Sequence, residues 1–114
     1  MMDHRLYLAQ RLSALIMAPL TLAHIGLMIY AVQGGLSAAE ILGRTQGSLA
    51  WFLFYGLFVL AVSIHAAIGL RTILREMTSL PASFINGLSW VILIALLTTG
   101  GRAVLAVTFA VAMP

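Results

Sequence analysis

Long runs of apolar residues, separated by short polar stretches, dominate the chain. Three runs can be read directly, over residues 12–32, 49–70 and 84–112. A helix needs roughly 20 residues to cross the hydrocarbon core of a membrane, so each run is long enough to span it. The pattern predicts an all-α integral membrane protein with three transmembrane helices, in which residues 1–114 form a single domain.

The polar stretches predict how these helices are connected. Ser37 is followed three residues later by a glutamate, the pattern of a capping box, so a short interfacial helix should begin there. Residues 71–83 are expected to form a polar connection between the second and third spans. Pro19 predicts a mild kink in the first span, whereas the pair Gly100-Gly101 leaves tilt, a kink or a break of the third span open.

Composition supports a membrane setting and narrows the chemistry. With 62% hydrophobic and 8% charged residues, a soluble globule could not cover its surface with polar groups. The chain has no cysteine, which excludes disulfides, thiolate catalysis and iron–sulfur ligation, so a metal would have to be held through His, carboxylate or Met. The pI is near 10.2, but the net charge is only +3, and no nucleic acid is expected as a partner.

The arginines predict the orientation in the lipid bilayer. Four of the six Lys and Arg residues flank the apolar runs on one side, and an excess of positive charge marks the cytoplasmic side. The N-terminus is therefore expected in the cytoplasm and the C-terminus outside. The four residues are Arg5, Arg11, Arg71 and Arg75.

Two of the three histidines, His24 and His65, lie inside apolar runs, where an ionisable side chain usually has a function. With a rise of about 1.5 Å per residue, His24 lies roughly 20 Å from the cytoplasmic edge and His65 roughly 9 Å. This difference of about 11 Å argues against both histidines serving one haem within this chain, because axial ligands face each other across the iron. His4, at the charged N-terminus, is expected to be solvated.

Small residues flank His65 on its own helix face. Ala61 and Gly69 leave a shallow groove where a porphyrin or another backbone could approach closely. The alternative is that His65 hydrogen-bonds a neighbouring carbonyl and Gly69 merely packs helices. His24 likewise has neighbours that fit either a haem or an ordinary helix contact.

Two motifs resemble those of a known family. Residues 11–14, RLSA, are similar to the Arg-x-Ser-Gly signature of the cytochrome b membrane anchor of succinate dehydrogenase and fumarate reductase, the respiratory complex II family. Residues 65–76 resemble its His-x3-Gly-Ile-Arg-His-Leu-x2-Asp segment. Chain length, three spans and the order of both motifs agree, so the resemblance covers nearly the whole chain.

The resemblance implies roles for five residues. His65 takes the place of the axial ligand of a haem b iron, and Arg71 that of the arginine near the haem propionates. Arg11 takes the place of the arginine that lines the quinone site, supported by Ser13. Tyr7 stands where a quinone-site serine is expected and could donate a hydrogen bond to a quinone carbonyl, or it could be an interfacial aromatic residue.

The chain also departs from the one-haem members of that family. Gln10 and Thr72 stand where those members have histidines. His24 resembles instead the axial ligand of a second haem iron in two-haem members. Arg102 falls near the depth of His24, where its partner is either the propionates of that haem or, alternatively, Glu40 or water at a broken helix end.

The resemblance implies a haem b-binding anchor that carries electrons between an iron–sulfur subunit and a quinone in the bacterial inner (plasma) membrane, with one or two haems. Such an anchor is a subunit of an enzyme and holds no dicarboxylate chemistry itself. An iron–sulfur subunit and a flavoprotein subunit would dock on the cytoplasmic face. A second small membrane anchor subunit would complete the helix bundle and supply the opposing histidines, as a homodimer also could.

Two alternatives remain open. One is a haem-free anchor of the same complex, in which His65 and Arg71 are structural. The other is a non-redox membrane adaptor or assembly protein, which should purify without flavin and iron–sulfur subunits.

Overall fold

The structure, a computed structural model, describes residues 4–109 of the chain. Within this range it contains four α-helices joined by short connections. Three of them are long and apolar enough to cross a membrane. The prediction of an all-α protein with three spans is therefore confirmed, although its last residues, 110–112, lie outside the described range. The helices are α1 (His4–Gly34), α2 (Ala38–Thr45), α3 (Leu49–Met77) and α4 (Ala82–Thr108).

The long helices extend beyond the apolar runs that predict them. α1 begins at His4 rather than near residue 12, and α3 continues through Arg71 to Met77. The predicted connection over residues 71–83 is therefore wrong in its bounds, because only residues 78–81 link α3 to α4. Hydropathy marks the hydrocarbon layer, whereas helical hydrogen bonding continues into the interface, where arginine side chains are well solvated.

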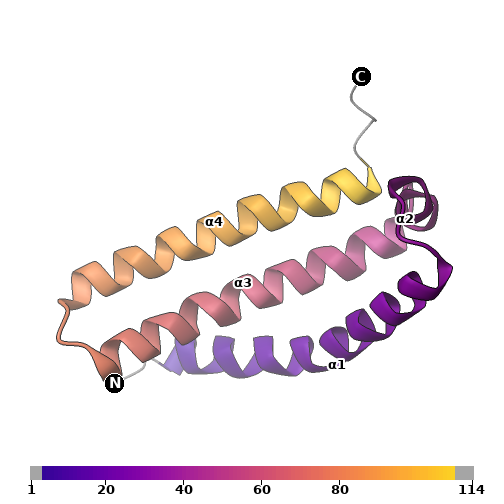
Figure 1. Ribbon diagram of the computed structural model, residues 1–114. Coiled ribbons are helices and arrows are strands. Elements are labelled where there is room, and N and C mark those ends of the chain that lie inside the picture. Colours follow the sequence, from indigo (N-terminus) through magenta and orange to yellow (C-terminus); the bar gives the residue numbers. More distant parts are fainter. Residues whose placement is uncertain (1–3, 110–114) are drawn as a thin grey trace.

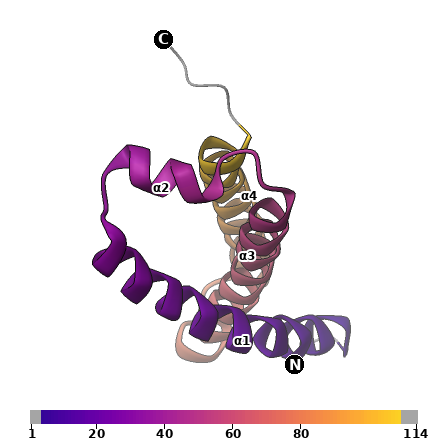
Figure 2. The ribbon, with the colours of Figure 1, turned by 90° about the vertical axis from the view of Figure 1, so that its right-hand side faces the viewer.

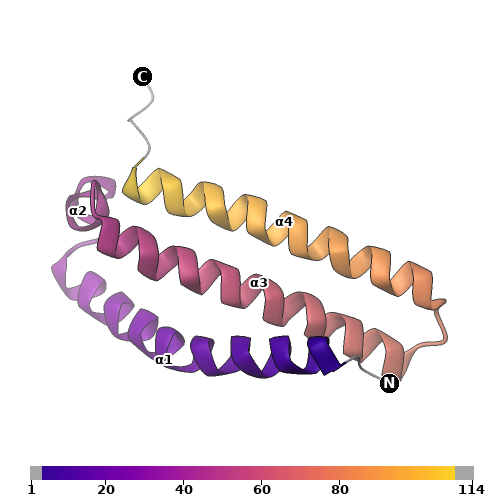
Figure 3. The same cartoon turned by 180° about the vertical axis from the view of Figure 1, so that it is seen from behind.

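The three long helices form a layer with α3 in the middle, packed against α1 on one side and α4 on the other (Figures 1 and 3). The start of α1 and the connection over residues 78–81 lie at one end, which we call the N-terminal end. The opposite end, which holds α2, is the α2 end. Most apolar side chains stay exposed on the faces of this layer, and the buried ones are Ala61, Ala67, Ile68, Ile85 and Val104.

α4 passes through Gly100 and Gly101 without a break. A Cβ atom on Gly100 would lie only 2.6 Å from Cγ1 of Val59 on α3, whereas one on Gly101 would meet nothing within 4 Å. The missing side chain of Gly100 lets the two helices approach closely. Of the possibilities that the sequence left open for this pair, a break is excluded.

α1 bends near its middle, where Pro19 lies, and its second half moves away from α3 (Figures 1 and 2). Proline removes one backbone donor and clashes with the preceding turn, which accounts for the bend. α2 then crosses from the end of α1 back to the end of α4, as Figure 2 shows. Its N-cap is the predicted one, since Ser37 Oγ accepts a hydrogen bond from the Glu40 backbone N–H at 3.1 Å.

Two side chains near the C-terminus of α2 form hydrogen bonds at the ends of α1 and α4. Arg44 Nη2 donates to the Gly35 carbonyl oxygen at 3.1 Å, just beyond α1. Thr45, which is buried, donates through Oγ1 to the Val107 carbonyl oxygen of α4 at 2.6 Å. These carbonyls lie at helix C-termini, where no intrahelical donor reaches them. α2 thereby connects the ends of α1 and α4.

Candidate functional site

His65 lies where α3 packs against α1, toward the N-terminal end. Its Nδ1 atom is 3.4 Å from Ser13 Oγ of α1. The Ser13 hydroxyl also donates to the Gln10 carbonyl oxygen at 2.9 Å, and its side chain is only 4% exposed. His65 itself is half-buried. The imidazole therefore makes a polar contact between two spans.

The groove beside Gly69 is taken up by α1. A Cβ atom on Gly69 would lie 3.4 Å from Gln10 Nε2. The neighbour of Gly69 on α1 is therefore a side-chain amide and not the backbone of another helix. The other amide atom, Gln10 Oε1, is buried and has no hydrogen-bond partner among the described residues.

His24 lies in the second half of α1 and faces aromatic residues of α3. Its ring centroid is 5.3 Å from that of Phe58 and 6.2 Å, edge-on, from that of Tyr55. The Nδ1 atom is buried and finds no hydrogen-bond partner in residues 4–109. A buried polar atom without a partner costs about 1–3 kcal/mol.

Two cavities adjoin His24 at the α2 end. One, of about 330 Å³, lies among all four helices, and the other, of about 340 Å³, runs along α1 and α2. Both volumes fall within the range of small-molecule and cofactor sites. The walls are mostly apolar, with α2 forming one side of each. The first is lined by Ile41, Phe58, Val59, Gly100 and Val104, among others.

The two imidazoles lie at different depths. His65 is level with Ser13, whereas His24 is level with Phe58, which precedes His65 by seven residues on the same helix. Seven residues correspond to about 10 Å along the helix axis. Along α1, the eleven residues from Ser13 to His24 correspond to about 16 Å, so the two imidazoles differ in depth by about 10 Å or more.

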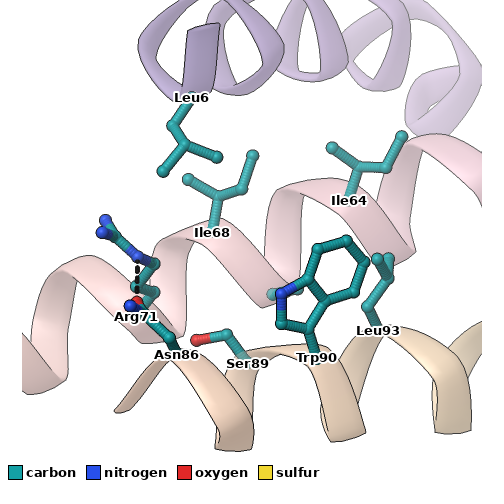
Figure 4. Close-up of a pocket in the computed structure, with 9 residues that line it drawn as sticks. Leu6, Ile64, Ile68, Arg71, Asn86, Ser89, Trp90 and Leu93 are labelled. Carbon is teal, nitrogen blue, oxygen red and sulfur yellow. Dashed lines mark hydrogen bonds between the residues drawn. The ribbon is translucent and has the colours of Figure 1, made fainter. Parts of the chain in front are cut away.

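Arg71 points to α4 rather than to the His65 contact. Its Nε donates to Asn86 Oδ1 at 2.9 Å, at the edge of a cavity of about 380 Å³ between α3 and α4 (Figure 4). Trp90 and Ser89 lie on the α4 side of this cavity, and the Arg71 Nη atoms point away from Asn86. Six residues turn a helix by about 600°, which places Arg71 about 120° around α3 from His65. A propionate role for Arg71 would therefore use its terminal Nη atoms.

The three predicted quinone-site residues do not share a face. The Arg11 guanidinium lies 5.8 Å from the centroid of the Tyr7 ring, and both side chains are exposed on α1. Ser13 is two residues from Arg11, a turn of about 200°, and it lies in the buried contact with α3. The structure brings Arg11 and Tyr7 together and separates Ser13 from them.

Arg102 is exposed on α4, two turns from the end of the helix. Its neighbours Gly100 and Ala103 line the same cavity as His24, so the expected match in depth is present. Because α4 is unbroken, water at a broken helix end is not its partner. Glu40 lies on α2, with its carboxylate against Gly35.

Sequence reasoning missed four residues around these groups: Tyr55 and Phe58 beside His24, and Asn86 and Trp90 beside Arg71. The first two stand three residues apart at the depth of His24, so a comparison of depths along the spans could have found them. The positions of Asn86 and Trp90 beside Arg71 depend on which face of α4 packs against α3, and no pattern in the sequence indicates that face. Among residues 4–109, no three His, Asp or Glu side chains converge to hold a metal ion.

Comparison with known protein families gives one match. The family model of the succinate dehydrogenase/fumarate reductase transmembrane subunit matches residues 2–101, which include α1, α2, α3 and most of α4. Arg102 falls just beyond the match. No curated protein and no solved structure matches the chain significantly. Since the match covers most of the chain, including both intramembrane histidines, the chain belongs to the family of succinate dehydrogenase/fumarate reductase transmembrane subunits.

Proposed function

We propose that this chain is a haem b-binding membrane anchor that carries electrons between an iron–sulfur subunit and a quinone. The observation that carries the proposal is the pair of imidazoles in membrane spans at two depths, His65 beside Ser13 and His24 beside a cavity. The buried His24 Nδ1 atom without a partner fits a site completed from outside the chain. His65 and His24 would each hold a separate haem iron through an imidazole nitrogen.

Haem b, when bound, supplies a one-electron relay between the iron–sulfur subunit and the quinone. This chain would contribute one imidazole to each iron, an apolar wall, and cations for the propionates. Arg71 would serve the haem at His65 through its terminal Nη atoms. Arg102, at the level of the His24 cavity, would serve the second haem.

The quinone would bind at the N-terminal end, against Arg11 and Tyr7. A guanidinium and a phenol are both hydrogen-bond donors suited to a quinone carbonyl. Reduction to the quinol takes two electrons, from the iron–sulfur subunit, and two protons, from the water that reaches this end of the helices. Ser13 is left out of this site because it is buried on another face of α1.

The complex we propose has the iron–sulfur and flavoprotein subunits on the cytoplasmic face of a bacterial inner membrane, at the N-terminal end of the bundle. The positive charge at that end supports this orientation. A second small anchor subunit would cover the exposed faces of the helix layer and supply the opposing histidines.

One observation favours a second candidate, a haem-free anchor of the same complex. His65 already contacts Ser13, Gln10 fills the space beside Gly69, and Arg71 is bonded to Asn86. In that case these side chains would only hold the helices together. A non-redox adaptor has no comparable support, because the family is that of a respiratory enzyme subunit.

A pyridine haemochrome assay of the purified complex tests the proposal. We expect two haems per copy of this chain in the wild type, and one in His65→Ala and in His24→Ala. His4→Ala, which changes the exposed histidine at the start of α1, is the matched control and should keep both haems. A complex that contains flavin and iron–sulfur subunits but no haem would leave the haem-free anchor as the function.

A further inference from the structure

The contact between Ser13 and His65 bears on which ring nitrogen of His65 carries a hydrogen. The Ser13 hydroxyl has one hydrogen, and the Gln10 carbonyl oxygen, at 2.9 Å, is its acceptor. Ser13 Oγ has lone pairs left, so at its second contact, 3.4 Å from His65 Nδ1, it acts as the acceptor. In this arrangement the donor is the Nδ1–H group of the imidazole.

A neutral imidazole with its hydrogen on Nδ1 has a free lone pair on Nε2. That lone pair is what a ligand of a metal ion needs, and histidine ligands almost always donate their other N–H group to a neighbouring acceptor. Ser13 is 4% exposed, so water does not compete for its oxygen. Its own hydrogen bond to Gln10, within one turn of α1, fixes the direction of the hydroxyl.

We propose that Ser13 is a positioning residue for His65. It holds the imidazole as the Nδ1–H tautomer and fixes its rotation, so that Nε2 is presented as an iron ligand. This inference rests on the proposed haem function, and it assigns Ser13 a role different from the quinone contact that the sequence motif implies. A hydroxyl acceptor at Nδ1 also raises the electron-donating strength of the imidazole and favours ferric iron.

The test compares Ser13→Ala with Ser63→Ala in the purified complex. Ser63 is the matched control, because it is a buried serine on the His65 helix whose hydroxyl donates to Val59 within that helix, at 2.7 Å. Ser13→Ala should keep the His65 haem, weaken its affinity by about 10-fold, raise its midpoint potential, and alter its electron paramagnetic resonance signal. Ser13→Thr, which restores the hydroxyl, should return the potential and the signal to wild-type values.

The possible failures can be told apart. If Ser13→Ala does not assemble, Ser13→Cys carries the test, because a thiol fills the same space but is a weak acceptor, and it should shift the potential in the same direction. A Ser13→Ala complex whose potential and signal equal those of Ser63→Ala overturns the inference. A wild-type complex without haem overturns the proposed function instead, whatever Ser13 does.

Discussion

Neighbouring residues of one motif can act on opposite sides of a helix. Arg11 and Ser13 belong to the same four-residue motif, yet Arg11 is exposed beside Tyr7 whereas Ser13 is buried against His65. A step of two residues turns an α-helix by about 200°, so a single pocket cannot contact both side chains directly. The motif therefore presents one side chain outward from α1 and one toward α3.

Arg11→Ala should impair quinone reduction by the assembled complex about 10- to 100-fold, the effect of losing a hydrogen bond from a charged donor. Transfer of electrons to a soluble acceptor should stay within about twofold, because that path does not use the anchor. The measurement is the ratio of the two activities. Arg5→Ala, one and a half turns away on the same helix, is the control for loss of positive charge. Equal loss of both activities in Arg11→Ala would count against a quinone role.

At the scale of single residues, the sequence predicted how deep a side chain lies in the membrane better than it predicted the direction in which that side chain points from its helix. Composition placed His24 and His65 in hydrocarbon, and counting residues gave their separation. The direction of a side chain can be predicted only if the face of the helix that carries it is known. Grouping residues by motif instead placed Ser13 beside Arg11 and Arg71 beside His65. Helical geometry alone could have separated both pairs. The contact of Gln10 with Gly69 and the bond of Asn86 to Arg71 could not be predicted, because they depend on how α1 and α4 are rotated against α3.

At the scale of elements, helix ends and helix packing follow different rules from hydropathy. The apolar runs located all three spans, but α3 extends past Arg71 because an arginine is as compatible with a helix as with a loop. The pair Gly100-Gly101 has low helix propensity, and yet α4 continues through it. The gain from close packing against Val59 and from satisfied backbone hydrogen bonds in hydrocarbon outweighs that propensity.

Gly100→Ala should destabilise the packing of α3 against α4 by about 1–3 kcal/mol, the usual cost of overpacking. The new methyl group would lie 2.6 Å from Val59 Cγ1, and a valine in a helix has essentially one rotamer, so it cannot turn away. Thermal unfolding of the purified complex in detergent measures the effect. Gly101→Ala, where nothing lies within 4 Å, is the control and should be neutral or slightly stabilising.

Val59→Ala should relieve the clash, so the double variant Gly100→Ala/Val59→Ala should be more stable than Gly100→Ala alone. If Gly100→Ala is as stable as Gly101→Ala, then α3 and α4 do not approach as closely as the structure shows. The cavity beside His24 is lined by both Gly100 and Val59, so loss of the second haem in Gly100→Ala would connect this packing to the site.

At the scale of the whole molecule, the described residues form one open layer of three spans. Within it, His65 faces Ser13 and His24 faces aromatic rings, so neither imidazole is opposite another histidine. A bis-histidine iron takes two imidazoles on opposite sides at the same level, and His24 and His65 are about 10 Å apart along the axis. Expressed alone in membranes, the chain should therefore bind little haem, and expressed with a second small anchor subunit it should bind two. Haem per chain, by haemochrome assay with quantified protein, makes the comparison. Full haem in the chain alone, at the mass of a dimer, would instead show that a second copy supplies the opposing histidines.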